Sequence, residues 1–364
     1  MPAQANRRTP ILRALAAAAV ATASFLAAPL DAQAQKKTDF KVCWSIYAGW
    51  MPWGQIQESG LMKKWAEKYK INVEIVQIND YVESINQYTA GAYDGCSMTN
   101  MDALSIPAGG GVDTTALIVG DYSNGNDGIV LKGASKLADI KGQKVNLVEL
   151  SVSHYLLVRA LDSVGLAEKD LTVVNTSDAD LVAAYKTDAV TAVVTWNPLL
   201  SEVAGMAKST KVFDSSQTPG EIIDVMMVNT DTLKANPDFG KALVGAWYEM
   251  MSIMSGSDAA AKEARTAMAK ASGTDLAGYE SQLASTAMFY KPAEAVAFVQ
   301  DAQLPKTMDF VRNFLFSKGI LGENAPSADF VGIEFPDGKT LGDKNNIKLR
   351  FDTTYMQMAA DGKL

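Results

Sequence analysis

The repeated alternation of strand-like and helix-like segments restricts the fold of this sequence more than any other feature. Short runs rich in β-branched residues alternate with longer stretches whose apolar residues recur at helical spacing. This alternation is typical of a parallel sheet with crossover helices. The first unit is expected to contain strands at Phe40–Tyr47, Val73–Ile78, Cys96–Thr99 and Ala116–Val119 and helices at Ile56–Tyr69 and Tyr81–Ala90.

The same pattern starts again near Gly128 without a low-complexity linker. The second unit is expected to contain strands at Gly128–Leu131, Lys144–Val148, Leu171–Val174 and Ala189–Thr195, a helix at Ser153–Val164 and another from Leu181. Two α/β units in one chain predict two lobes joined by crossing strands. We expect residues 35–127 and 227–364 to form one lobe and residues 128–226 the other.

The chain beyond the strand predicted at Ile222–Asn229 is expected to be mainly helical. The expected helices lie at Phe239–Ser255, Asp258–Ser272, Leu276–Leu283, Ala293–Gln303 and Lys306–Lys318. Pro305 should break or kink the pattern before the last of them, because proline cannot donate a backbone hydrogen bond inside a helix.

The first residues have the pattern of a secretory signal peptide. Three arginines precede an Ala-rich apolar run over Ala14–Leu30, and Ala32-Gln33-Ala34 places small residues where a signal peptidase reads them. Pro29 and Asp31 disfavour the alternative, a membrane anchor. We therefore expect residues 1–34 to be removed on export to the periplasm, by either the Sec or the twin-arginine route.

The net charge of −8 disfavours nucleic acid and anionic lipid as partners. The two cysteines, Cys43 and Cys96, both fall in predicted core strands. A disulfide and two buried free thiols are alternatives that the sequence leaves open, because an oxidising compartment permits the first and free cysteine is often buried.

The sequence contains no recognisable catalytic constellation. Its single histidine, His154, has no cysteine beside it, so neither a metal-binding cluster nor a local Cys/His signature is present. Gly109-Gly110-Gly111 lacks the Lys-Ser/Thr that a phosphate-binding loop requires. We expect no catalytic residue, no metal and no cofactor, and therefore not an enzyme.

Polar and aromatic residues follow the predicted strands, at the edge where open parallel sheets bind ligands. The candidate ligand-binding residues are Trp50, Trp53, Asp80, Tyr81, Asn100, Asp102, Tyr122, Asp127, Glu149, Ser153, His154 and Trp196. Capping of the following helix is the alternative role of Asp80, Asp102 and Ser153. Packing beneath the loops is the alternative role of the tryptophans.

Several motifs together resemble a known family. They are Trp50-Met51-Pro52-Trp53, Asp139-Ile140-Lys141-Gly142-Gln143-Lys144-Val145, Gly165-Leu166, Asp188-Ala189-Val190 and Trp196-Asn197-Pro198. In this order they resemble the solute-binding proteins of the nitrate/sulfonate/taurine class of ABC importers. The segment Asp121-Tyr122-Ser123-Asn124-Gly125-Asn126-Asp127-Gly128 is similar to the subgroup associated with urea-carboxylase, or guanidine-carboxylase, transporters.

This resemblance implies an α/β fold of the type II-like periplasmic binding protein, with a hinge, an inter-lobe cleft and a mainly helical C-terminal part. It also implies a monomer that closes on a small solute in the cleft. The implied partners are an inner-membrane permease and its cytoplasmic ATPase.

The charge of the candidate loops indicates which solute to expect. All four arginines of the mature chain lie outside these loops, which instead contain Asp80, Asp102, Asp121, Asp127 and Glu149. Acidic and aromatic side chains suit a small planar solute of the guanidine or urea type. One alternative is a receptor for nitrate, a sulfonate or taurine that uses helix N-termini. The other is an enzyme of the pyrimidine-precursor type, which needs a reactive His or Cys.

Overall fold

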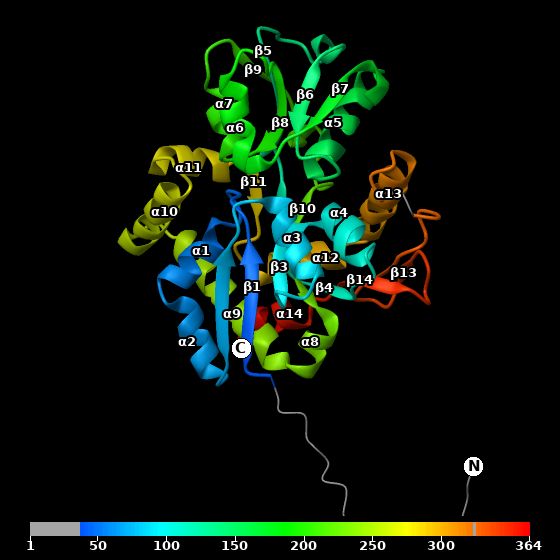
Figure 1. The fold of residues 1–364 in the computed structure, drawn as a ribbon. Coiled ribbons are helices and arrows are strands. Elements are labelled where there is room, and N and C mark those ends of the chain that lie inside the picture. Colours follow the sequence, from blue (N-terminus) through cyan, green and yellow to red (C-terminus); the bar gives the residue numbers. More distant parts are fainter. Residues whose placement is uncertain (1–36, 323–324) are drawn as a thin grey trace, which may run out of the picture. The chain divides into compact units, whose positions relative to one another are not determined.

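The computed structural model describes residues 37–322 and 325–364, which fold into two α/β lobes (Figure 1). The expected signal peptide lies outside the described residues. No helix in the described part of the chain has both the length and the apolar character needed to cross a membrane.

The sheet of the first lobe has nine strands among the described residues, in the order β13-β12-β14-β4-β10-β3-β1-β2, with β11 paired to β4. Their bounds are β1 Asp39–Trp44, β2 Asn72–Gln77, β3 Gly95–Thr99, β4 Thr114–Ser123, β10 Ile223–Asn229, β11 Thr286–Met288, β12 Gly332–Glu334, β13 Thr340–Leu341 and β14 Ile347–Phe351. Strand β1 is parallel to β2 and β3, whereas β10 runs antiparallel between β3 and β4.

The sheet of the second lobe has five strands in the described chain, in the order β7-β6-β8-β5-β9. Their bounds are β5 Asp127–Lys132, β6 Lys144–Leu147, β7 Thr172–Asn175, β8 Ala192–Trp196 and β9 Ser209–Asp214. The chain leaves the first sheet at the end of β4 and returns to it with β10. The two connections between the lobes therefore lie next to each other, because β4 and β10 are paired.

Helices flank both sheets (Figure 1). Their bounds are α1 Met51–Glu58, α2 Leu61–Lys68, α3 Tyr81–Thr89, α4 Asn100–Ala103, α5 Val152–Ser163, α6 Asp178–Lys186, α7 Leu199–Ala204, α8 Thr230–Ala235, α9 Pro237–Met254, α10 Ala259–Ala271, α11 Leu276–Leu283, α12 Pro292–Gln300, α13 Gln303–Ser317 and α14 Thr354–Ala360. Helix α4 continues into a π-helical turn at Leu104–Ala108. Short 3₁₀ turns occur at Leu137–Ile140, Glu168–Asp170 and Ser215–Gln217.

The prediction of a single helix over Ile56–Tyr69 is wrong, because the structure has two helices there. Gly60 has a φ angle of 77°, a left-handed conformation that ends α1 and starts α2. Helix α1 also begins earlier than expected, at Met51. Pro52 fits this start, because a residue in the first helical turn needs no intrahelical hydrogen bond from its nitrogen.

The C-terminal region differs from the prediction in two respects. Pro305 does not separate two helices, because it lies in the first turn of α13, where its missing N–H costs no hydrogen bond. The region is also less helical than expected, since β12, β13 and β14 extend the first sheet beside β4. These strands have two to five residues, too few for a clear alternating pattern.

Large aromatic side chains pack the first lobe. Trp53 stacks on Trp247 of α9 with ring centroids 4.6 Å apart, and Phe40 of β1 stacks on Phe239 at 4.5 Å. All four side chains are at least 98% buried. Helix α9 is therefore held against the sheet and α1 by rings that contribute the largest buried apolar areas of any residue type.

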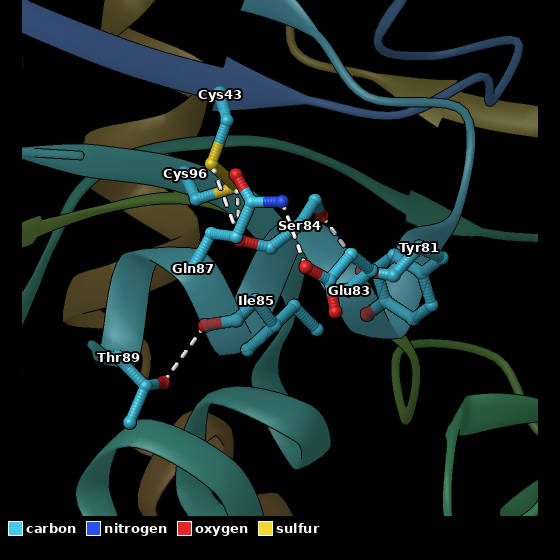
Figure 2. Close-up of a disulfide and its surroundings, with 8 residues drawn as sticks. All are labelled: Cys43, Tyr81, Glu83, Ser84, Ile85, Gln87, Thr89 and Cys96. Atoms are coloured by element: carbon cyan, nitrogen blue, oxygen red, sulfur yellow. Dashed lines mark hydrogen bonds between the residues drawn. A yellow bond between two sulfur atoms is a disulfide. The ribbon is translucent and has the colours of Figure 1, made fainter. Parts of the chain in front are cut away.

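The two cysteines form a disulfide beneath α3 (Figure 2). Cys43 of β1 and Cys96 of β3 are direct partners across neighbouring strands, with Cα atoms 4.4 Å apart. Both sulfur atoms lie beside the carbonyl oxygen of Ser84, at 3.4 and 3.7 Å. Of the two alternatives that the sequence left open, the structure has the disulfide, because strand pairing places the two side chains face to face.

We expect the double variant Cys43→Ser with Cys96→Ser to have a lower unfolding free energy by about 3–4 kcal/mol, because the bond closes a long loop of the unfolded chain. This corresponds to a melting temperature lower by about 5 °C, measured by circular dichroism. Tris(2-carboxyethyl)phosphine should lower the melting temperature of the wild-type protein in the same way and leave the double variant unchanged. Equal melting temperatures for the oxidised wild-type protein and the double variant would contradict this expectation.

Candidate ligand-binding site between the lobes

A small cavity lies where the strand ends of both lobes meet. Its volume is about 10 Å³, room for about one water molecule in this arrangement of the lobes. Its lining residues are Tyr47, Trp50, Tyr81, Thr99 and Asp224 from the first lobe and Asp127, Val152 and Trp196 from the second. The carboxyl ends of β1, β3 and β8 and the amino ends of the antiparallel strands β5 and β10 all reach this cavity.

Four of the eight residues that line the cavity have aromatic rings. The rings of Tyr47 and Trp50 have centroids 5.0 Å apart, those of Trp50 and Tyr81 5.7 Å, and those of Tyr81 and Trp196 5.4 Å. The indole N–H of Trp196 donates across the lobes to the carbonyl oxygen of Ile46 at 3.0 Å. These contacts arrange the four rings in a row along the cavity wall. The negative faces of such rings attract cations.

Asp224 brings a buried carboxylate to the cavity. It lies near the start of β10, where its neighbours in the sheet are Asp121 of β4 and Thr99 of β3. Its side chain is 2% exposed, and its Oδ2 atom makes no hydrogen bond within the described chain. Burial raises the pKa of Asp224 well above its usual value, and the charge of Asp121 raises it further.

Asp121 lies behind Asp224 and is fully buried. The hydroxyl of Tyr47 donates to its Oδ1 atom at 2.9 Å. The backbone of Gly49 passes so close that a Cβ atom there would lie 2.6 Å from the carboxylate and 2.5 Å from the Tyr47 ring. Glycine is therefore required at this position, and the loop after β1 is closely fitted to the carboxylate. Burial raises the pKa of Asp121 to about 7.

Asp127, the first residue of β5, supplies a carboxylate from the second lobe. It is 3% exposed, and among the described residues its side chain accepts a hydrogen bond from the hydroxyl of Ser123 at 2.6 Å. Burial raises its pKa to about 7. In the described part of the chain no lysine or arginine forms an ion pair with this carboxylate or with those of Asp121 and Asp224. The cavity is therefore lined with acidic groups that lack basic partners.

Asp102 lies beside the cavity and joins the two lobes. Its Oδ2 atom accepts hydrogen bonds from the hydroxyls of Tyr81 at 2.6 Å and Thr99 at 2.9 Å and from the backbone N–H of Val152 at 3.3 Å. Val152 is the first residue of α5. Helix N-termini are common anion sites, but here the carboxylate of the protein itself takes that position. Burial raises the pKa of Asp102 to about 6.

Two further carboxylates cap helices across the lobe boundary. Asp178, the first residue of α6, accepts from the backbone N–H of Tyr81 at 3.1 Å. Asp80, the N-cap of α3, accepts from the hydroxyl of Ser177 at 2.7 Å and from the backbone N–H of Glu83 at 2.9 Å. Burial raises the pKa of Asp178 to about 6. Each lobe thus satisfies polar groups at a helix start of the other, so the lobes are in direct contact.

Of the twelve candidate residues, four line the cavity, namely Trp50, Tyr81, Asp127 and Trp196. Asp80 and Asp102 make the cross-lobe hydrogen bonds described above. Trp53 lies in the core against Trp247. Tyr122 stacks on Phe298 with centroids 5.8 Å apart. The amide of Asn100 donates to the carbonyl oxygen of Glu221 and accepts from the backbone N–H of Ile223.

The three remaining candidates lie around the start of α5, outside the cavity wall. Glu149 is exposed. Ser153 is not the N-cap, because its backbone N–H donates to the hydroxyl of Ser151, which caps the helix. His154 Nδ1 accepts from the backbone N–H of Leu150 at 3.1 Å, and its Nε2 atom lies 3.3 Å from the carboxylate of Glu168. Of the first three residues of α5, Val152 lines the cavity, and Ser153 and His154 do not.

Four residues of the cavity wall were not among the candidates: Tyr47, Thr99, Val152 and Asp224. Asp224 has the clearest signal in the sequence, because it is the single charged residue within the otherwise apolar run Ile222–Val228. A charge in a buried strand needs a partner or a function. The described residues contain no group of three or more His, Cys, Asp or Glu side chains arranged to hold a metal ion.

The two sheets, their neighbouring connections and the cavity between the lobes define the two-lobed fold of the periplasmic binding proteins. A family model described as "NMT1/THI5 like" matches residues 62–255. The chain therefore belongs to the NMT1/THI5-like family.

Solved structures show the same fold. The alkanesulfonate-binding protein SsuA from Xanthomonas axonopodis pv. citri, bound to MOPS, has a TM-score of 0.65 and 16% identity over 79% of this chain and 96% of that one. The aliphatic sulphonate binding protein SsuA from Escherichia coli has a TM-score of 0.62 and 18% identity over 78% and 93%. The nitrate-binding protein NrtA from Synechocystis PCC 6803 has a TM-score of 0.56 and 13% identity over 89% and 99%.

A curated relative is the taurine-binding periplasmic protein of Escherichia coli K12. It is 25% identical over 130 residues, which are 35% of this chain and 40% of the relative. The match therefore spans less than half the length of that protein.

We expect the ligand-free protein to become less stable as the pH rises from 5 to 8. The raised pKa values of Asp102, Asp121, Asp127 and Asp178 mean that the folded protein binds more protons than the unfolded chain in this range. Their stabilisation is fully present below about pH 4 and is lost as the pH passes through about 6–7. Calorimetry should show a loss of at least about 2 kcal/mol, since one pKa unit corresponds to about 1.4 kcal/mol.

The variant Asp127→Asn serves as the control, because it removes one of these titrating groups and should have a shallower pH dependence. A wild-type protein that becomes more stable between pH 5 and 8 would contradict the expectation. The carboxylates with lowered pKa values, such as Asp170 and Asp337, act below about pH 4 and do not affect this range.

Proposed function

We propose that this protein is the periplasmic solute-binding component of an ABC importer and that it captures a small planar cation of the guanidinium type. The observation that carries the proposal is the cavity itself, in which a row of four aromatic rings lies beside Asp127 and Asp224. The small space between the lobes, which are in direct contact, favours a solute of few heavy atoms. Urea is the neutral solute of the same shape.

The chemistry of the cavity wall suits guanidinium in two ways. The in-plane N–H groups of the ion pair with carboxylates, and each charge-assisted hydrogen bond contributes about 1.5–3 kcal/mol. Its flat face can lie against an aromatic ring, and a desolvated contact of this kind contributes about 2 kcal/mol. Urea can make similar planar contacts but gains less from the carboxylates because it has no charge.

A second candidate is a receptor for taurine, another sulfonate or nitrate. The names of the relatives favour it, since one is a taurine-binding protein and others are named for sulfonates and nitrate. The cavity wall does not favour it, because no lysine or arginine lines it. In addition, the first backbone N–H of α5, a group that could bind an anion, already donates to the carboxylate of Asp102.

We propose a role in transport rather than catalysis. An enzyme of the pyrimidine-precursor type would need a reactive His or Cys at the cavity. His154 lies outside the cavity wall and pairs with Glu168, and both cysteines form the disulfide. The partners in this proposal are an inner-membrane permease and its ATPase, and the receptor acts as a monomer without nucleic acid.

Isothermal titration calorimetry at pH 8 should show tighter binding of guanidinium, at millimolar or lower concentration, than of urea, taurine or nitrate. The variant Asp127→Asn should weaken guanidinium binding about 10- to 100-fold, because it removes a charge-assisted interaction, and should change urea binding less than about 3-fold. Asp180→Asn, an exposed residue of α6, is the matched control. Binding of taurine or nitrate without binding of guanidinium would refute the proposed solute.

We also expect the solute to favour the closed arrangement of the lobes by contacting both of them. The variant Asp178→Ala removes the cross-lobe hydrogen bond to Tyr81 and should shift the ligand-free protein toward an open form, by about tenfold for each 1.4 kcal/mol lost. Small-angle X-ray scattering should then give a larger radius of gyration than for Asp180→Ala, which changes an exposed carboxylate of the same helix. Identical curves for the two variants, with and without solute, would contradict lobe closure.

A further inference from the structure

Asp121 and Asp224 form a carboxyl pair at the inner end of the cavity. They are direct cross-strand partners on β4 and β10, and they are 0% and 2% exposed. Two negative charges held this close in a buried site repel each other, so each carboxylate favours the protonated form of its neighbour. The pair therefore holds one proton and one negative charge.

The surroundings of the pair prevent a second negative charge. The ionisable groups that interact with it are Tyr47, which donates to Asp121, Asp127, and Tyr279 and Tyr290. Arg265 acts on these two tyrosines and forms its ion pair with Glu280 at 2.9 Å. Loss of the proton of the pair would leave two adjacent buried charges without a cation among the described residues.

Only Asp224 of the two lines the cavity. Asp121 is held from behind by Tyr47 and by the close backbone of Gly49. The Oδ2 atoms of both residues are buried and have no hydrogen-bond partner in the described chain. Asp224 is therefore the member of the pair whose carboxyl group can reach the space that a solute would fill.

We propose that the Asp121–Asp224 pair distinguishes a cation from a neutral solute by exchanging its proton for the cation. Capture of a cation then releases this proton to solvent. Before capture the pair carries one proton and one negative charge, and the cation is free in solvent. After capture both carboxyl groups are ionised, the cation is bound beside them and the proton is in solvent. The net charge of the cavity is the same before and after capture. Asp224 is the specificity-determining residue, and Asp121 is a positioning residue. This inference rests on the proposed function and adds to it the means by which a cation is told from a neutral solute of the same shape.

Calorimetric titration with guanidinium chloride tests the exchange in the wild-type protein. Titrations at pH 8.0 in several buffers of different ionisation enthalpy give the number of protons released for each cation bound. At this pH Asp127, whose pKa is about 7, is mainly ionised, so the released proton is that of the pair. We expect close to one proton for guanidinium and none for urea. Release of at least half a proton supports the exchange, and a smaller value overturns it.

The variant Asp224→Asn supplies the independent test, because asparagine has the shape and the donor of a protonated aspartic acid but cannot ionise. It should abolish proton release and weaken guanidinium binding at least tenfold, while the affinity for urea stays within about 3-fold. Asp127→Asn is the matched control, since it should also weaken guanidinium binding but retain the proton release. Undiminished release in Asp224→Asn would overturn the proposal.

The pH dependence of wild-type binding provides a readout that needs no variant. Between pH 7.5 and 8.5 the affinity for guanidinium should rise about tenfold for each pH unit, since one proton is released per cation. The affinity for urea should be constant. Guanidinium binding without pH dependence or proton release overturns the exchange and leaves the proposed function intact. Binding of taurine or nitrate in place of guanidinium overturns both.

Discussion

Burial of negative charge without a basic partner is the constraint on which the central part of this protein depends. Asp102, Asp121, Asp127 and Asp224 are all at least 97% buried where the two sheets meet. An unpaired buried charge is costly, and the structure limits this cost with neutral donors and with protonation. Tyrosine and serine or threonine hydroxyls donate to three of the carboxylates. A solute that brings a positive charge relieves the same cost, which links the fold directly to the proposed choice of ligand.

The fold is shared with proteins that are named for sulfonates and nitrate, and in this chain two helix starts are occupied by its own carboxylates. The N-terminus of α5 can attract an anion in principle. In this chain Asp102 accepts the N–H of Val152 from across the lobes, and Asp178 does the same for Tyr81 at α3. Hydrogen bonds from the starts of these helices to carboxylates of the opposite lobe therefore hold the two lobes together. In the proposed function, the solute contacts carboxyl groups and aromatic rings at the cavity wall.

Much of the fold could be predicted because strands and helices have local patterns. The strand–helix alternation, its second start near Gly128 and the two-lobed fold are all found in the structure. Trp50, Tyr81, Asp127 and Trp196 were also candidates and line the cavity. Position after a strand does not determine which way a side chain points, however. Trp53, only three residues after Trp50, stacks on Trp247 in the core and does not line the cavity.

The sequence by itself determined the class of fold and the acidic, aromatic character of the strand ends, because periodicity and composition are local properties. Only the tertiary structure decided which of those residues share a cavity and which cap helices across the lobes. The pairing of Cys43 with Cys96 and of Asp121 with Asp224 had the same origin. Each pair joins residues more than fifty positions apart, and only the order and register of the strands bring them together.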